Sequence, residues 1–298
     1  AMKKNLKISF RNLELLAKFL VKTHNQGIHW GLFPSSTGDI DSVREYVPGD
    51  KRLDCRSSLR TGKVMSRTFI PERQMNIFII LDGSGSQFYG QSLTKIEAGV
   101  LVGLYFNFLA GAVNDRVGLL TFDQSVRTFC EPTLNEGYVS SLLMNFLSER
   151  KIFRGTNSLI ALRKILSLEL SDTLFVFISD FYFPIEDKFL TLMKSLAFGK
   201  NNAAIAVILV NKKEWAWPRQ KFSGKLLDAE DNSKFLSVNF NDLKLIKSQE
   251  QSFSQWQKCL FKKFRQCHCR TALIDVNQEK RMLFPLVRLL LNCSTVKL

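Results

Sequence analysis

The chain has 298 residues, 45% of them hydrophobic, which is enough to bury a substantial core in one large domain or two small ones. It carries 42 Lys and Arg against 27 Asp and Glu, and the net charge of +15 leaves nucleic acid, an anionic membrane or an acidic protein open as partners. The 6 cysteines are scattered through a long chain, which excludes a small disulfide-stapled scaffold and indicates free thiols in a reducing compartment.

The start of the chain shows no signal-peptide pattern, and Ala1 before Met2 is typical of a cloning scar. The longest apolar run, residues 98–113, contains Asn107 and is shorter than the roughly 20 apolar residues that a membrane span needs. We therefore expect a buried helix here, no membrane span and a cytoplasmic protein.

Residues 1–75 are predicted to form an N-terminal extension. They begin with a helical period around residues 13–21 and then become polar and glycine-rich. Residues 76–298 follow the pattern of one α/β domain, interrupted at about 211–249 by a loop-like insertion. Within that insertion we expect a hairpin that turns at Asp231-Asn232.

Between residues 76 and 298, short apolar strands alternate with helical periods. The predicted strands are 77–82, 116–122, 125–130, 173–180, 203–210 and 271–276. The predicted helices are 93–113, 136–149, 157–169, 186–199, 252–266 and 280–291. This alternation indicates an α/β fold, a doubly wound, mostly parallel six-stranded sheet with helices on both faces. The short connection Asp123-Gln124 predicts that one strand is an antiparallel edge strand.

The first core strand runs directly into the turn Asp82-Gly83-Ser84-Gly85-Ser86. This turn lacks the third glycine of a dinucleotide-binding fingerprint, the first glycine of a nucleophile elbow and the Gly-Lys-Ser/Thr of a phosphate-binding loop. Its strand-and-turn geometry resembles that of all three motifs, but its chemistry matches none of them.

The side chains of this turn are predicted metal ligands. Asp82, Ser84 and Ser86 lie at the carboxyl end of the strand, where open α/β sheets bind ligands. Asp180 ends the strand expected beside it, and Thr156 precedes a helix one crossover earlier. Carboxylate and hydroxyl oxygens suit Mg²⁺, or Mn²⁺ or Ca²⁺, rather than zinc, and two carboxylates leave a dication able to accept one more anionic oxygen. The alternative is a polar turn that caps the next helix.

These loops resemble a known metal site. The segments ILDGSGS, RGTNS and FISD, in this order, are similar to the three loops of the metal-ion-dependent adhesion site (MIDAS) of von Willebrand factor type A domains. The resemblance implies that Ser84, Ser86 and Thr156 bind the metal directly, and that Asp82 and Asp180 bind it directly or through water. It also implies that a partner protein supplies an acidic side chain to the metal.

An upstream segment, REYVPGDKRLDCRSSLRTGKVMSRTF (residues 44–69), resembles the signature of the bacterial domain-of-unknown-function 58 family. The matching residues are Tyr46, Pro48, Gly49, Asp50, Arg52, Asp54, Arg56 and Arg60. Lys51, Cys55 and Gln87 depart from the family pattern. Such proteins often occur beside MoxR-type AAA+ ATPases and are thought to act with them in chaperone-like assembly of complexes, so the resemblance implies such a partner.

Two other polar groups allow a functional and a structural interpretation. The arginines of the signature would contact a partner or a phosphate, or would pair with its aspartates as a brace; we favour the brace because the charges alternate in sign. Cys267-His268-Cys269 has no second pair at metal-ligand spacing, so we expect both cysteines to pack in the core.

The sequence thus predicts a non-catalytic protein that recognises a partner's acidic side chain through a bound divalent cation. A metal-dependent phosphoester hydrolase is the first alternative, although no nucleophile motif, second metal cluster or nearby histidine accompanies the loops. A nucleic-acid-binding protein is the second, although no basic stripe interleaved with aromatic residues is evident.

Overall fold

The structure is a computed structural model, and it describes residues 42–46, 55–68, 74–90, 93–148, 155–215, 223–227, 235–239, 242–278 and 281–295. These residues fall into two compact units, a smaller one between residues 35 and 74 and a larger one that contains the described residues from Met75 onward. The predicted helix around residues 13–21, the hairpin turn at 231–232 and the signature residues Pro48, Gly49, Asp50, Arg52 and Asp54 lie outside the described residues.

The smaller unit contains a two-stranded antiparallel sheet and one helix. Strands β1 (Ser42–Glu45) and β2 (Met65–Thr68) pair, and helix α3 (Cys55–Thr61) lies between them in the chain. The signature residue Tyr46 donates its backbone N–H to the Val64 carbonyl at 2.8 Å, which extends the β1–β2 pairing by one step. Arg56 and Arg60 lie on α3.

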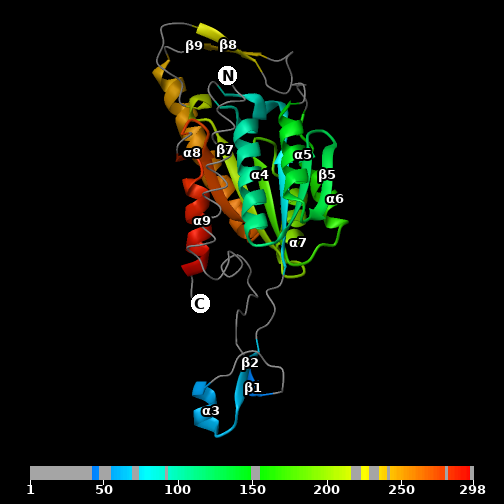
Figure 1. Cartoon of the computed structure of the whole chain (residues 1–298). Coiled ribbons are helices and arrows are strands. Elements are labelled where there is room, and N and C mark those ends of the chain that lie inside the picture. The colour runs from blue at the N-terminus through cyan, green and yellow to red at the C-terminus, as the bar shows by residue number, and fades with distance from the viewer. Residues whose placement is uncertain are drawn as a thin grey trace. The chain divides into compact units, whose positions relative to one another are not determined.

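The larger unit is built on a six-stranded sheet. Its strands are β3 (Asn76–Asp82), β4 (Arg116–Phe122), β5 (Val126–Thr133), β6 (Thr173–Ser179), β7 (Ala203–Val210) and β10 (Arg270–Asp275). Their order is β10-β7-β6-β3-β4-β5, and β5 alone runs antiparallel to its neighbour (Figure 1). The structure confirms the predicted mostly parallel six-stranded sheet, including the antiparallel edge strand.

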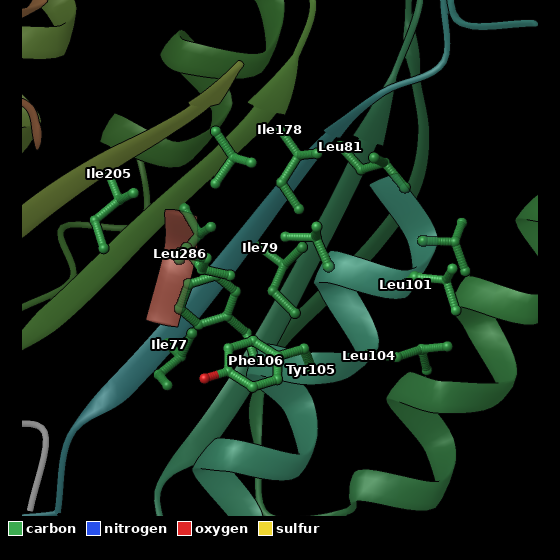
Figure 2. Close-up of a cluster of buried hydrophobic side chains, with 14 of the residues drawn as sticks. Ile77, Ile79, Leu81, Leu101, Leu104, Tyr105, Phe106, Ile178, Ile205 and Leu286 are labelled. Carbon is green, nitrogen blue, oxygen red and sulfur yellow. The ribbon is translucent and has the colours of Figure 1, made fainter. Parts of the chain in front are cut away.

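Helices cover both faces of this sheet, as predicted. They are α4 (Lys95–Ala112), α5 (Glu136–Ser148), α6 (Ser158–Leu166), α7 (Asp187–Phe198), α8 (Leu243–Gln266) and α9 (Phe284–Thr295). Successive strand residues point to opposite faces. Thus Ile79 packs in the core with residues of α4, α5 and α9 (Figure 2), whereas Ile80 packs in a second core with residues of α6, α7 and α8.

Helix α4 is the central helix of the first core and begins at a capping box. Thr94 accepts from the Glu97 N–H at 3.3 Å, and Glu97 Oε2 accepts from the Thr94 N–H at 2.8 Å. By length and composition α4 would suffice to cross a membrane, but 83% of its apolar window is buried inside the unit. The predicted buried helix is therefore confirmed, and the membrane-like composition reflects core packing on all sides.

Two helix boundaries differ from the prediction, whereas the predicted hairpin of the insertion is confirmed. Helix α8 starts at Leu243 rather than at 252, because Asp242 caps it by accepting from the Lys244 N–H at 2.8 Å, although the polar run 247–252 interrupts its apolar period. The stretch 211–249 contains η2 (Lys212–Glu214) and the antiparallel pair β8 (Ser223–Leu227) and β9 (Phe235–Asn239), the two strands of that hairpin. Helix α9 is displaced towards the C-terminus and begins with Pro285 in its first turn.

Candidate metal centre

The parallel strands end at one edge of the sheet, which we call the carboxyl rim. Asp82 is the last residue of β3, and the Gly83 N–H donates to the Phe122 carbonyl of β4 at 2.7 Å. A Cβ on Gly83 would lie 2.5 Å from Phe146 Cζ, so glycine allows this close approach. The chain then turns into the short helix η1 (Gly85–Phe88).

The serines of the turn face one another beside the Asp82 carboxylate. Asp82 Oδ1 accepts from the Ser84 N–H at 2.9 Å, and the hydroxyl oxygens of Ser84 and Ser86 lie 3.2 Å apart. Ser84 and Asp82 are buried, and Ser86 is half-buried. The predicted turn therefore presents one carboxylate and two hydroxyls at the rim.

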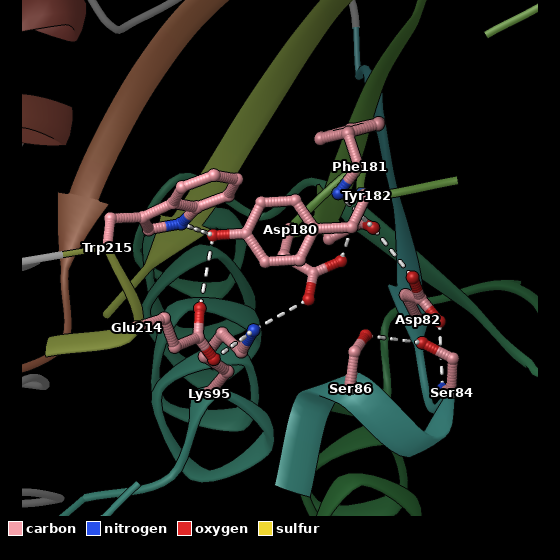
Figure 3. Close-up of polar contacts among 10 residues, drawn as sticks. Asp82, Ser84, Ser86, Lys95, Asp180, Phe181, Tyr182, Glu214 and Trp215 are labelled. Atoms are coloured by element: carbon pink, nitrogen blue, oxygen red, sulfur yellow. Dashed lines mark hydrogen bonds and ion pairs between the residues drawn. The ribbon is translucent and has the colours of Figure 1, made fainter. Parts of the chain in front are cut away.

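Asp180 joins this group from the neighbouring strand. It follows β6 directly, and Ser179 before it donates its hydroxyl to Asp82 Oδ2 at 2.6 Å and accepts from the Phe181 N–H at 2.9 Å. Ser179 therefore ties the ends of β3 and β6 together. Figure 3 shows the side chains of Asp82, Ser84, Ser86 and Asp180 pointing towards one another.

Thr156 is placed at the same rim by a different connection. The next residue, Asn157, donates its N–H to the Asp123 carbonyl at 2.8 Å, directly after β4, and caps α6 through its side chain. The loops that hold Ser84 and Thr156 thus flank the end of β4. Thr156 itself is half-buried.

The Asp82 carboxylate has no cation beside it in the described part of the chain. Its side chain is fully buried, and burial, followed by the nearby charge of Asp180, raises its pKa to about 7 from an ordinary value of 3.8, although Ser179 and Ser84 donate hydrogen bonds to it. A buried carboxylate in this state favours a proton or a cation.

Asp180, in contrast, is paired with Lys95, a residue that the sequence did not indicate as part of the site. Lys95 Nζ donates to Asp180 Oδ2 at 2.8 Å and lies 2.8 Å from Glu214 Oε1 (Figure 3). The Lys95 side chain is completely buried. Burial alone would lower its pKa, but the carboxylates of Asp180 and Glu214 outweigh burial and raise it.

The lysine links the rim to an aromatic cluster through Glu214. Glu214 Oε2 accepts from the Tyr182 hydroxyl at 3.1 Å. The Tyr182 hydroxyl oxygen in turn accepts from Trp215 Nε1 at 2.6 Å. The Tyr182 ring lies 5.0 Å from the Trp256 ring of α8, and Lys95 Nζ lies 4.6 Å above it. Trp215 links η2 to Tyr182 through this bond and to α8 through its ring contacts with Phe253 and Trp256.

Lys95 contacts two of the carboxylates at the rim. Its Nζ lies 2.8 Å from both Asp180 Oδ2 and Glu214 Oε1. Burial raises the pKa of Glu214, and the ammonium of Lys95 opposes that effect. Asp82 is the carboxylate of the three that Lys95 does not contact, so it is the one at which a bound cation would offset most of the cost of burial.

Lys95 and Glu214 left weak signals in the sequence. A cation in the first turn of a helix opposes the helix dipole, so Lys95 at the start of an otherwise apolar helix calls for a carboxylate partner. Glu214 follows β7 by a few residues and so lies at the same rim as Asp82. Ser179 and Tyr182, which flank Asp180, left no comparable signal.

The predicted packing role of the cysteines in Cys267-His268-Cys269 is confirmed. Both cysteines are buried in the core beneath α7 and α8, and burial raises the pKa of the Cys269 thiol. These residues precede β10 and therefore lie at the amino ends of the parallel strands, away from the carboxyl rim.

Comparison with known proteins identifies the family. A sequence profile described as "Protein of unknown function DUF58" matches residues 42–252, more than two thirds of the chain. The chain belongs to the DUF58 family. This confirms the resemblance read from the Tyr46–Arg60 segment, and the matched region includes both the smaller unit and the carboxyl rim.

Curated relatives of this DUF58 chain are themselves uncharacterized. It is 28% identical over 126 residues to a Mycobacterium bovis protein, a match of 41% of this chain and 40% of that protein. It is 34% identical over 62 residues to YeaD of Bacillus subtilis, which covers 20% of this chain and 15% of that protein. The chain thus spans about two fifths, or less, of the length of the curated relatives it matches.

Solved structures show distant likenesses. BatB from Bacteroides thetaiotaomicron, a conserved hypothetical protein, matches with 11% identity and a TM-score of 0.46 over 74% of this chain and 100% of that chain. The SpRpn10 VWA domain matches with 11% identity and a TM-score of 0.37 over 68% and 89%. These TM-scores are below 0.5, so the fold of this DUF58 chain is not argued from these structures. It rests on the strand order and on the family match.

The residues present at the rim fit a hard divalent cation. In the described part of the chain no three His, Cys, Asp or Glu side chains form a metal-binding group, so a cation here would also need hydroxyl ligands. Ser84 and Ser86 offer such hydroxyls beside the uncompensated Asp82 carboxylate. Carboxylate and hydroxyl oxygens suit Mg²⁺ or Mn²⁺ better than zinc.

Proposed function

We propose that this DUF58 chain is a non-catalytic recognition module that binds a divalent cation, Mg²⁺ first, at the carboxyl rim and thereby binds an acidic side chain of a partner protein. Asp82, Ser84, Ser86 and Thr156 would hold the cation, with Asp180 contributing charge directly or through water. When bound, the cation supplies the positive charge that offsets the cost of desolvating the partner's carboxylate.

The buried Asp82 carboxylate is the observation that carries this proposal. A fully buried carboxylate with a pKa raised to about 7 costs folding free energy at neutral pH unless a cation accompanies it. The Ser84 backbone N–H and the Ser179 hydroxyl donate to the Asp82 carboxylate. The hydroxyl oxygens of Ser84 and Ser86 lie beside it and are available as ligands. A polar turn that only caps η1 would not need a buried charge, and Ser84 makes no side-chain capping bond there.

Lys95 has a supporting role in the proposed site. It neutralises part of the Asp180 charge and holds that carboxylate through Oδ2, while Asp180 Oδ1 accepts from the Tyr182 N–H at 3.3 Å. Both Asp180 oxygens are thereby oriented by the protein. This arrangement favours a charge-balancing role for Asp180 over that of the main direct ligand.

The phosphoester-hydrolase alternative finds no support at the rim. Of the three histidines, His24 and His29 lie outside the described residues, and His268 precedes β10 at the opposite edge of the sheet. The described residues therefore place no histidine base beside Asp82. We propose that the module is not an enzyme, and a turnover screen with Mg²⁺ and Mn²⁺ against phosphoester substrates tests this.

The finer identity of the partner rests on the family resemblance. A MoxR-type AAA+ ATPase is proposed as the protein that supplies the acidic side chain, in a chaperone-like assembly system in the cytoplasm. A pull-down with the purified chain, in Mg²⁺ and in excess chelator, tests it. Capture of such an ATPase only in Mg²⁺ supports the proposal, and equal capture in chelator contradicts it.

Calorimetric titration of the metal-free protein tests the cation site itself. We expect Mg²⁺ or Mn²⁺ to bind with one-to-one stoichiometry, and we expect Asp82→Ala and the double variant Ser84→Ala/Ser86→Ala to weaken binding by at least about tenfold. Ser141→Ala is the matched control, because the exposed Ser141 hydroxyl only donates to the Gly137 carbonyl within α5. Equal affinity in the double variant and the control would refute the site.

A further inference from the structure

Helix α8 carries a row of exposed cations on the face that it turns to solvent. The row, which we call the α8 row, consists of Lys244, Lys247, Lys258, Lys262 and Arg265, all exposed. Their spacings of 3, 11, 4 and 3 residues are sums of helical steps, so the five side chains lie along one face of the helix. At about 1.5 Å per residue the row extends over about 30 Å.

The cations of the α8 row have no counter-ions in the described part of the chain. No ion pair joins them to any described residue, and Glu250 is the one acidic residue within α8. The remaining lysine of α8, Lys263, points elsewhere, since its Nζ donates to the Ile185 carbonyl at 2.8 Å. The row thus concentrates positive charge on one side of the larger unit, with no counter-ion among the described residues.

The opposite face of α8 is fully used by the domain. Ile246, Leu260 and Phe264 are buried, and Trp256 packs on Tyr182, whose hydroxyl bonds Glu214 of the Lys95 network. Trp256 thus places the middle of α8 beside the network at the carboxyl rim. In the helix Trp256 lies between Lys247 and Lys258, so the α8 row runs past the level of the rim on the outer side of α8.

We propose that the α8 row is a docking surface for an acidic segment of a partner protein, which the same partner reaches around α8 when it is bound at the cation site of the carboxyl rim. The inference rests on the proposed function for its second contact point, and it specifies the partner: one acidic residue for the cation and a run of Asp or Glu beyond it. Charge complementarity along a single line suits an extended or helical acidic segment.

Other ligands of a basic surface fit this face less well. The aromatic side chains of α8 are all engaged with the domain: Phe253 and Trp256 pack with each other and with Trp215, Phe264 is buried, and Phe261 packs against the second core. The row therefore has no free aromatic platform on α8 for unpaired bases. A helix lying on a membrane needs a free apolar face, and that of α8 is buried, with Leu245 its one exposed large apolar side chain among the described residues.

The test is fluorescence anisotropy of a labelled 20-residue poly-glutamate peptide with the full chain, in Mg²⁺ and in excess chelator. The row variant Lys258→Glu/Lys262→Glu/Arg265→Glu should weaken binding at least about tenfold in both buffers. The matched control, Arg116→Glu/Arg163→Glu/Arg288→Glu, changes the net charge equally at exposed positions on β4, α6 and α9 and should weaken it less than about threefold. Both variants replace solvent-exposed side chains, and thermal melting verifies that they fold.

The outcomes separate this inference from the proposed function. If the row variant loses peptide binding, the α8 row is supported as the docking surface. If Ser84→Ala/Ser86→Ala then binds the peptide as tightly as the wild type in Mg²⁺, the row stands and the proposed cation site fails. Equal weakening in the row variant and its control overturns the row, whatever happens at the rim. Tighter binding of a 20-base-pair DNA duplex than of the peptide, lost only in the row variant, overturns the acidic protein segment as the ligand.

Discussion

Lys95 pairs with some of the carboxylates at the rim and not with others. It is fully buried, at 2.8 Å from both Asp180 and Glu214, so two of the three acidic side chains have a built-in cation and Asp82 does not. A buried ion pair adds little net stability over an apolar substitute, but removing one partner leaves a buried charge unpaired. The contribution of Lys95 to stability is therefore best measured by removing it, which leaves the Asp180 and Glu214 carboxylates without their cation.

Replacement of Lys95 by methionine should destabilise the fold by about 3–5 kcal/mol at pH 8, because the buried Asp180 carboxylate and the half-buried Glu214 carboxylate lose the cation that they share. Urea unfolding measures the change, and saturating Mg²⁺ should restore part of it. Lys95→Arg, which keeps the charge, should lose less. A loss below about 1 kcal/mol for Lys95→Met would show that the carboxylates are not held as charges.

The raised pKa of Asp82 predicts that the stability of the metal-free protein depends on pH. Its pKa is about 7 in the folded state against an ordinary 3.8, so the folded state binds the proton more tightly, and the stability of the fold decreases as pH rises from about 4 to above 7. The full change is on the order of 4 kcal/mol. Asp82→Asn should remove this decrease, and Mg²⁺ should reverse it in the wild type.

The measurement is the free energy of unfolding from urea titrations at several pH values between 4 and 8, in chelator. Asp115→Asn is the control, since Asp115 is a buried carboxylate at the opposite end of β4 that accepts from the Met75 N–H at 3.0 Å. If the wild type and Asp82→Asn show parallel pH profiles, Asp82 does not hold its proton in the way described.

At the scale of elements, the strands were the most predictable part of the fold. All six carry continuous apolar runs, such as the Ala203–Val210 strand, which is buried throughout, and such runs need no partner to be recognised. The start of α8 was missed because the polar run 247–252 separates its first apolar residues from the rest of the period, and because its beginning depends on the Asp242 cap. The hydrophobic pattern of the sequence thus predicts which segments are buried, whereas caps and long-range contacts determine where helices and strands end.

The N-terminus of α4 positions Lys95, and its capping box is a further prediction. Thr94→Ala removes the hydroxyl that accepts from the Glu97 N–H, and it should cost about 1 kcal/mol of unfolding free energy and weaken Mg²⁺ binding, because the first turn of α4 carries Lys95. Thr94→Ser should retain both properties. Thr191→Ala on the exposed side of α7 is the control. Unchanged stability in Thr94→Ala would contradict a role for this cap.

At the scale of the whole molecule, the candidate site illustrates what topology lets a sequence reveal. Asp82, Ser84, Ser86 and Asp180 could be predicted to meet because parallel neighbouring strands end at one edge. Lys95 and Glu214 could not, since their pairing depends on how α4 and η2 pack over that edge. The signature of the smaller unit was predicted from its resemblance to the DUF58 family, which the family match confirms.

Anomalous X-ray diffraction from crystals grown with Mn²⁺ tests the central claim most directly. The account predicts one anomalous peak at the carboxyl rim, within coordination distance of Asp82 or its bound water and of the hydroxyls of Ser84 and Ser86. Diffraction to good resolution with no peak at this rim, in Mn²⁺ well above the calorimetric dissociation constant, would contradict it.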